Sequence, residues 1–297
     1  MSATPLAGSG KVTVPDILSW KACSTGSSGS KEAKKITCLT ACDYPTGRLL
    51  DDAGVDILLV GDSLAMVSLG YENTLPVTID EMLVHLRAVR RGTRHALLVA
   101  DMPYGSYHVS AEESVRNAIR LVKEGGAEAV KIEGGERRME LIARLIDAEI
   151  PVMGHVGLTP QSIHAMGGFH VQGKSSEAAR QLERDARAVE AAGAFSIVLE
   201  SMPRELGARI TQSLRIPTIG IGAGPDCDGQ VLVFHDLVGL TMGHRPKFAR
   251  RYANLATEVS RAASEFCADV RDGKFPSDAE SYHSPAEIRE EIVTERR

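Results

Sequence analysis

Five apolar runs in the sequence each carry an ionisable residue at or near their end. These residues are Asp62 after "ILLVG", Asp101 after "LLVA", Lys131 and Glu133 in "AVKIEG", His155 in "PVMGHVG" and Glu200 in "SIVLES". Carboxylates grouped with a lysine and a histidine can bind a cation and can transfer protons. The residue types therefore indicate a site for acid-base or metal-assisted chemistry.

The alternation of side chains along a strand predicts that these groups lie together. Successive residues of a strand point to opposite faces of the sheet. The predicted inward faces hold Leu58, Val60 and Asp62; Leu97, Val99 and Asp101; Ala129, Lys131 and Glu133; Met153 and His155; and Ser196, Val198 and Glu200. Because the carboxyl ends of barrel strands open on one side, we expect the polar groups at a single mouth.

Three of the predicted inward residues have the chemistry of a magnesium site. Asp62, Asp101 and Glu133 offer carboxylate oxygens. Mg²⁺ binds few carboxylates and keeps positions for water or substrate, whereas a zinc site would contain more histidine or cysteine. We therefore expect Mg²⁺ as the metal.

Each residue also has an ordinary structural role when it is considered alone. An aspartate after an apolar run usually caps a turn or a helix, and Lys131 could form a structural ion pair with Glu133. His155 could orient a ligand carboxylate, hold Glu200 or Lys131 in place, or fill the mouth of the barrel. Five unrelated caps would have no reason to share one face, so the joint pattern favours a functional site.

The elements that must position these residues are short strands and helices in alternation. The eight apolar runs are "ITCLTA", "DILLVG", "ALLVADM", "EAVKIEG", "IPVMGHVG", "FSIVLES", "IPTIGIGAG" and, least clearly, "GQVLVFHDLVG". Helical spacing of apolar residues marks the segments 78–92, 110–126, 136–149 and 176–193, and Ser110 and Glu113 have capping-box spacing. This alternation predicts the α/β class and a closed (β/α)8 TIM barrel, with a doubly wound open sheet as the alternative.

The termini are expected to lie outside the barrel. Residues 1–33 would form a short amphipathic helix, "VPDILSWK", and a Ser/Gly connector, "CSTGSSGS". Residues 34–275 would form the barrel and a C-terminal helical extension, which we expect at roughly 247–272. Residues 276–297 would form a polar tail that is mobile or docks on a neighbouring subunit.

Composition points to a cytoplasmic protein with small-molecule partners. The 297 residues carry a formal net charge of −5, which does not favour binding to nucleic acid or to an anionic membrane. The five cysteines are odd in number and contain no C-x-x-C pair, so neither a disulfide framework nor a zinc site is predicted. No apolar run approaches the roughly 20 residues of a membrane span, and the N-terminus lacks the pattern of a signal peptide.

Other short motifs carry little weight. "GSGKV" does not fit the P-loop pattern, "GIGAGP" lacks the last glycine of a dinucleotide fingerprint, and "DCDG" is too short for an EF-hand. No G-x-S-x-G nucleophile motif is present in the sequence.

The assembled motifs closely resemble those of the ketopantoate hydroxymethyltransferase (3-methyl-2-oxobutanoate hydroxymethyltransferase) family. The resemblance rests, in order, on "LLVGDS", "TLPVTIDEM", "LLVADMPYGSY", "AVKIEGG", "GHVGLTPQS", "GGFHVQGK", "IPTIGIGAGPDCDGQVLV" and "HRPKF". It spans about residues 34–275. The sequence departs from the family pattern at Cys42, where "TAYD" often has tyrosine, and its two termini look longer than usual.

The resemblance implies a (β/α)8 barrel and a specific reaction. The family transfers a one-carbon unit from 5,10-methylenetetrahydrofolate to 3-methyl-2-oxobutanoate, which gives 2-dehydropantoate for the biosynthesis of pantothenate and coenzyme A. By resemblance, Asp62 and Asp101 bind Mg²⁺, Glu133 is a third and partly outer-sphere metal ligand, and Glu200 is the proton acceptor. The keto acid would be contacted by Asp62, Ser63, Asp101 and Lys131. The resemblance also implies a homo-oligomer, commonly a decamer.

Two other functions stay open at this point. The barrel could be a Mg²⁺-dependent C–C lyase or aldolase acting on another α-keto acid, and turnover that ignores the folate would favour that reading. It could instead be a barrel that binds a ligand without catalysis, in which case the variants Asp62→Asn, Asp101→Asn and Glu200→Gln would have no activity to lose.

Overall fold

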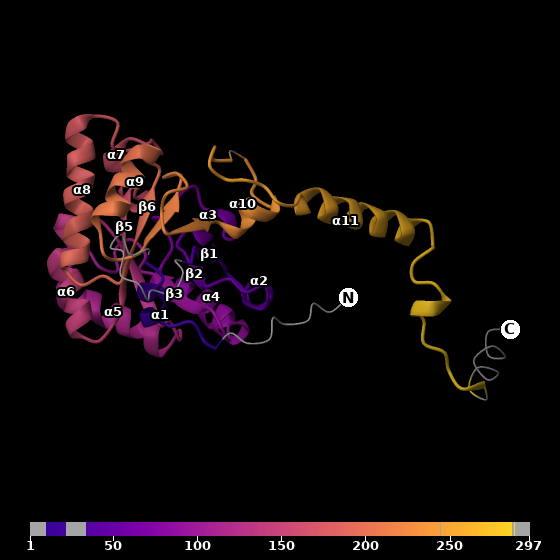
Figure 1. Ribbon diagram of the computed structural model, residues 1–297. Coiled ribbons are helices and arrows are strands. Elements are labelled where there is room, and N and C mark those ends of the chain that lie inside the picture. The colour runs from indigo at the N-terminus through magenta and orange to yellow at the C-terminus, as the bar shows by residue number, and fades with distance from the viewer. Residues whose placement is uncertain (1–9, 22–33, 244, 287, 289–297) are drawn as a thin grey trace. The chain divides into compact units, whose positions relative to one another are not determined.

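A computed structural model describes residues 10–21, 34–243, 245–286 and 288, and its strands form a closed barrel (Figure 1). All neighbouring strands are parallel, and the eighth pairs with the first. The strands are β1 (Ile36–Thr40), β2 (Ile57–Val60), β3 (Leu97–Asp101), β4 (Ala129–Glu133), β5 (Val152–Gly157), β6 (Ser196–Glu200), β7 (Thr218–Ile221) and β8 (Gly229–Leu232). The predicted (β/α)8 barrel is confirmed, and the open sheet is wrong.

Helices follow most of the strands, as the periodicity predicted. They are α2 (Tyr44–Asp52), α3 (Leu64–Val67), α4 (Ile79–Gly92), α5 (Ala111–Lys123), α6 (Met139–Asp147), α7 (Ile163–Met166), α8 (Ser176–Ala191), α9 (Arg204–Ser213) and α10 (Phe234–Val238), with 3₁₀ turns η1 (Glu136–Arg138) and η2 (Pro160–Ser162). Side-chain caps start several of them; Ser110 Oγ accepts a hydrogen bond from Glu113 N–H at α5. The least clear apolar run divides into β8 and α10.

The C-terminal helix is shorter than predicted. It is α11 (Leu255–Arg271), and it is followed by the 3₁₀ turn η3 (Asp278–Glu280). The described residues form two compact units. One is the described part of Met1–Leu237 together with Thr241–Arg250, and the other comprises Val238–Leu240 and the described part of Arg251–Arg297. The domain boundaries expected near residues 33 and 275 stay predictions, and the Ser/Gly connector lies outside the described residues.

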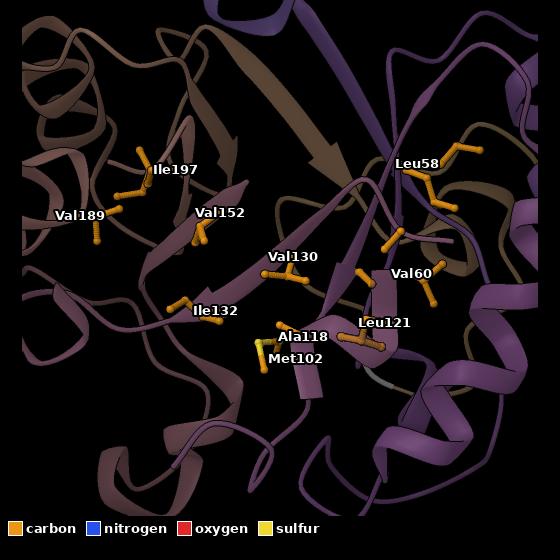
Figure 2. Close-up of a cluster of buried hydrophobic side chains, with 14 of the residues drawn as sticks. Leu58, Val60, Met102, Ala118, Leu121, Val130, Ile132, Val152, Val189 and Ile197 are labelled. Carbon is orange, nitrogen blue, oxygen red and sulfur yellow. The ribbon is translucent and has the colours of Figure 1, made fainter. Parts of the chain in front are cut away.

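Two apolar layers hold the barrel. The inner layer includes Ile57, Leu59, Leu97, Val99 and other inward strand residues, and the outer layer joins strand residues to the helices. In Figure 2, Val130, Ile132, Val152 and Ile197 belong to the outer cluster, together with Ala118, Leu121 and Val189 of the helices. The side chains of β3 to β6 therefore point toward the inside and the outside of the barrel as the alternation predicted.

Strand β2 is the exception, and the prediction for it was wrong. Leu58 and Val60 belong to the outer cluster with the helices (Figure 2), while Ile57 and Leu59 line the interior. Strict alternation would then place Asp62 on the outside. The strand ends at Val60, however, so alternation no longer applies at Asp62.

Helix α1 (Val14–Ser19) closes the amino-terminal end of the barrel, which confirms the predicted N-terminal helix. Its Ile17 is fully buried in the inner apolar layer. Lys21 next to the helix pairs with Asp228, just before β8, at 2.7 Å. The described chain includes no helix long and apolar enough to cross a membrane.

Replacing Ile17 by alanine should destabilise the barrel. The change would remove buried methyl groups at the amino-terminal end of the barrel and leave a cavity. Such a cavity typically lowers the free energy of unfolding by about 2–4 kcal/mol. Urea unfolding followed by circular dichroism measures it. The control is Leu18→Ala on the same helix, because Leu18 is 40% exposed and its loss should have an effect below about 1 kcal/mol. Equal effects of both changes would contradict this role of Ile17.

Candidate active site

The polar mouth of the barrel lies at the carboxyl ends of β3 to β6. Asp101 ends β3, Glu133 ends β4 and Glu200 ends β6. The strand register sets Asp101 beside Lys131 and Glu133 beside His155. Apart from Glu200, these residues are all at most 6% exposed. The structure thus gathers the polar groups that alternation predicted for these four strands.

Asp62 reaches the same place from a turn. The chain leaves β2 through Gly61, and the N–H of Asp62 donates a hydrogen bond to Asp101 Oδ2 over 3.0 Å. A Cβ at position 61 would lie 3.3 Å from that oxygen and 3.1 Å from Ser63 Oγ. A side chain at this position would therefore crowd the site, and glycine allows the close approach of the backbone.

Asp101 connects the two sides of the site. Its Oδ2 accepts the hydrogen bond from Asp62, and its Oδ1 lies 2.8 Å from Lys131 Nζ, close in distance although not aligned as a hydrogen bond. Burial lowers the pKa of Lys131, but the charges of Asp101, Glu133 and Asp62 outweigh it and raise that pKa above its ordinary value. Lys131 is therefore a cation at neutral pH.

Negative charge exceeds positive charge in this cluster. Burial raises the pKa of Asp62 well above its ordinary value, and the charges of Asp101 and Glu133 raise it further. Lys131 and the side-chain amide of Gln161 act in the opposite direction. An additional cation among these carboxylates would relieve the repulsion that raises the pKa of Asp62.

His155 lies between two glutamates. Its Nδ1 is 3.4 Å from Glu133 Oε1, and its Nε2 is 3.1 Å from Glu200 Oε2 in a contact that is not aligned as a hydrogen bond. Burial and the charge of Lys131 lower the pKa of His155, but its contacts with Glu133 and Glu200 raise that pKa to about 9. Burial raises the pKa of Glu133, yet the interaction with His155 brings it below its ordinary value. Its Nδ1 also lies 3.5 Å from Lys131 Nζ, so His155 contacts both of the groups that it was expected to hold in place, Glu200 and Lys131.

Glu200 is the most accessible carboxylate of the group. Its side chain is 15% exposed, against 5% for Asp101 and 4% for Glu133. The next residue, Ser201, has a φ of +48°, in the left-handed region that L-residues rarely adopt. Glu200 is thus the carboxylate best placed to meet a ligand from solvent.

Ser63 lies at the edge of this cluster. It is the N-cap residue of α3, but its hydroxyl makes no capping hydrogen bond to the described chain. It lines a small pocket of about 10 Å³, roughly the space of one water molecule, together with Thr40, Ala41, Cys42, Gly61, Leu64, Val67 and His235. Cys42 forms part of this pocket wall, and burial raises the pKa of its thiol.

Two residues of the site had no role assigned from the sequence. Gln161 Nε2 donates to Asp62 Oδ2 over 2.9 Å, and Tyr107 Oη donates to Gln161 Oε1 over 2.6 Å. Both side chains are buried. Their only signal in the sequence was their place in "GHVGLTPQS" and "LLVADMPYGSY", because uncharged polar residues in loops do not indicate a site by themselves.

The residues present fit a metal that uses few protein ligands. The described chain includes no group of three or more acidic, histidine or cysteine side chains arranged to hold a metal. The backbone N–H of Asp62 contacts Asp101 Oδ2, however, and Asp101 Oδ1 lies 2.8 Å from Lys131 Nζ without an aligned hydrogen bond from the described chain. Two carboxylates with open positions for water or substrate suit Mg²⁺.

Comparison with known proteins identifies relatives along most of the chain. The family model described as ketopantoate hydroxymethyltransferase matches residues 23–278. A 3-methyl-2-oxobutanoate hydroxymethyltransferase of Koribacter versatilis is 64% identical over 254 residues, which cover 86% of each chain. The protein of the same name from Pelobacter propionicus is 55% identical over 273 residues, which cover 92% of this chain and 98% of that one.

Solved structures of lower sequence identity share the fold. Oxaloacetate acetylhydrolase, in complex with 3,3-difluorooxalacetate, has a TM-score of 0.57 and 12% identity, with 97% of this chain and 95% of that chain covered. Phosphonopyruvate hydrolase, in complex with oxalate and Mg²⁺, has a TM-score of 0.54 and 18% identity, with 88% and 91% covered. At these identities the likeness supports the barrel fold.

The contacts of His155 predict how stability depends on pH. Its pKa rises on folding from 6.5 to about 9, so its protonation stabilises the folded state fully below pH 6.5, and this contribution is lost as the pH rises towards 9. The loss should be at most about 3 kcal/mol. Urea unfolding at pH 6.5, 7.5 and 9 in the presence of EDTA measures it in the wild type and in His155→Gln. The same pH dependence in both proteins would refute the assignment.

Proposed function

Because this chain belongs to the ketopantoate hydroxymethyltransferase family, we propose that it transfers the one-carbon unit of 5,10-methylenetetrahydrofolate to 3-methyl-2-oxobutanoate with the aid of Mg²⁺. One water molecule would be consumed, because it supplies the hydroxyl group of the product, and the products would be 2-dehydropantoate and tetrahydrofolate. Its relatives are named as enzymes that act on this keto acid, so a barrel without catalysis is no longer a candidate. What we propose is the identity of the co-substrate and the metal, and the role of each residue.

The observation that carries the proposal is the contact of Asp62 with Asp101 and of Asp101 with Lys131. The first is a 3.0 Å hydrogen bond and the second a 2.8 Å ion pair, and all three groups are buried at the open end of the barrel. An α-keto acid carries a carboxylate and a keto oxygen on adjacent carbons. A metal held by Asp62 and Asp101, together with the fixed ammonium group of Lys131, would complement the negative charge of these oxygens.

Asp62 and Asp101 would hold the metal, and Glu133 would act from further out. Both oxygens of Glu133 already have partners, since Gln161 N–H donates to Oε2 over 3.0 Å and His155 lies 3.4 Å from Oε1. This agrees with a partly outer-sphere role. When bound, Mg²⁺ would supply a Lewis acid that stabilises negative charge on the keto oxygen.

The remaining residues would orient the substrate and move its proton. Lys131 would place positive charge beside the keto acid, and the Ser63 hydroxyl would donate a hydrogen bond to it. Glu200 would accept the proton from C3, because it is the least buried carboxylate and His155 holds it by a contact of 3.1 Å. The resulting carbon nucleophile would then form a C–C bond with the methylene carbon carried by the folate. The bonds from that carbon to the folate nitrogens would break, and water would supply its hydroxyl group.

Assembly and location are also part of the proposal. We expect a homo-oligomer, with the decamer implied by resemblance as its most specific form. Exposed apolar side chains on α11 support association, since Val259, Phe266 and Val270 are 60%, 55% and 46% exposed. The cytoplasmic location stays a prediction.

The test of the proposal is an assay of 2-dehydropantoate formation under three conditions. Product should form with Mg²⁺ and methylenetetrahydrofolate together, and formation should stop when EDTA removes the metal or when the folate is omitted. Mass spectrometry of the product measures the reaction. Turnover of the keto acid that continues without the folate would show the C–C lyase or aldolase reaction instead.

Replacing Glu200 by glutamine should abolish the proton transfer while retaining the fold. Loss of a general base typically lowers the rate by about 10²–10⁴-fold. Exchange of the C3 proton of 3-methyl-2-oxobutanoate in D₂O, followed by proton NMR with Mg²⁺ and no folate, reports this step alone. The control is Glu205→Gln, which changes a glutamate in the first turn of α9 outside the acidic cluster. Undiminished exchange in Glu200→Gln would remove Glu200 from its role.

A further inference from the structure

Gln161 contacts three parts of the active site at once. It lies in η2, directly after β5, and is 7% exposed. Its N–H donates to Glu133 Oε2 over 3.0 Å, while its Nε2 donates to Asp62 Oδ2 over 2.9 Å and to the carbonyl oxygen of Met102 over 3.0 Å. One residue therefore links the chain after β2, the chain after β3 and the end of β4.

Tyr107 determines which way the Gln161 amide points. Its hydroxyl accepts a hydrogen bond from Glu133 N–H over 3.2 Å, and it donates its one proton to Gln161 Oε1 over 2.6 Å. An amide turned by 180° would set Oε1 against two acceptors, Asp62 Oδ2 and the Met102 carbonyl. It would also leave the Tyr107 proton without its acceptor. The network thus selects the orientation in which the NH₂ group faces Asp62.

The hydrogen-bond network also assigns the two oxygens of Asp62 to different partners. Oδ2 accepts from Gln161, and no hydrogen bond from the described chain engages Oδ1. A buried amide that satisfies its donors and its acceptor is stable only in this arrangement, since each unmatched group would be unfavourable. The side chain of Asp62 is therefore held with one defined oxygen available to a ligand.

We propose that Gln161 is a positioning residue that orients Asp62 and Glu133 for the metal and the keto acid, and that Tyr107 fixes the direction of its amide. The inference rests on the proposed function, because it assigns Asp62 to the metal. Gln161 and Tyr107 would act through the metal ligands and would not contact the substrate. Partners of this kind typically change metal affinity by about 10–100-fold when they are lost.

The experiment measures Mn²⁺ binding to the full-length protein by electron paramagnetic resonance. Mn²⁺ accepts the same oxygen ligands as Mg²⁺. Tyr107→Phe removes one hydroxyl and keeps the ring, and Gln161→Met removes the amide while nearly preserving its volume. Each should weaken Mn²⁺ binding by about 10-fold or more, and kcat should fall more than the KM for the keto acid rises.

A double-variant cycle separates positioning from a general loss of structure. If Tyr107 acts through Gln161, the variant with both changes should bind Mn²⁺ as weakly as Gln161→Met alone. Tyr71→Phe is the control, because it also deletes a hydrogen-bonded phenol hydroxyl, one that donates to the Glu81 carboxylate over 2.9 Å; it should bind Mn²⁺ as the wild type does.

Three outcomes would count against the inference. Wild-type affinity in Tyr107→Phe or in Gln161→Met would overturn it, and so would additive effects in the double variant. A wild-type protein that binds no Mn²⁺ would instead refute the proposed metal site and the inference with it, so the two failures are distinguishable.

Discussion

The charge balance around Asp101 is the constraint on which the active-site end of the barrel depends. Asp101 is buried, yet it receives the backbone N–H of Asp62 on one oxygen and the ammonium group of Lys131 near the other. Buried charges are stable only with partners. Because the cluster holds more carboxylates than cations, it stays unbalanced until a further cation binds. Burial raises the pKa of Asp62, and the charges of Asp101 and Glu133 raise it further.

The barrel supplies the frame that makes such a cluster possible. Its inner apolar layer and Ile17 exclude water from the amino-terminal end, while the outer layer of strand and helix residues holds each strand in register. The register sets Asp101 beside Lys131 and Glu133 beside His155 on neighbouring strands. The polar groups can therefore be dense at one end without disrupting the apolar core below them.

Loop residues complete the active site that the strand ends form. Asp62 arrives through the turn at Gly61, and Gln161 comes from the 3₁₀ turn after β5. Tyr107, in the loop after β3, joins the backbone of Glu133 to the amide of Gln161. Each of these links is a directional hydrogen bond, so the loops determine which oxygen of each carboxylate is free. Strands bring the charges together, and loops determine their orientation.

The sequence by itself determined the barrel and most of the site. Apolar runs in alternation with helical segments predicted all eight strands, and alternation correctly placed the inward groups of β3 to β6, because period-2 geometry is a local property of an extended chain. The ordered motifs indicated the family.

Only the tertiary structure decided how Asp62 enters the site and which residues hold it. Alternation failed at Asp62 because the strand had already ended at Val60, and periodicity holds only within a strand. The start of α11 at Leu255 was also not evident from composition. Tyr107 and Gln161 are 54 positions apart, and Gln161 and Asp62 are 99 apart. Hydrogen bonds across such separations form only when the barrel closes, so no local pattern of residues could have indicated them.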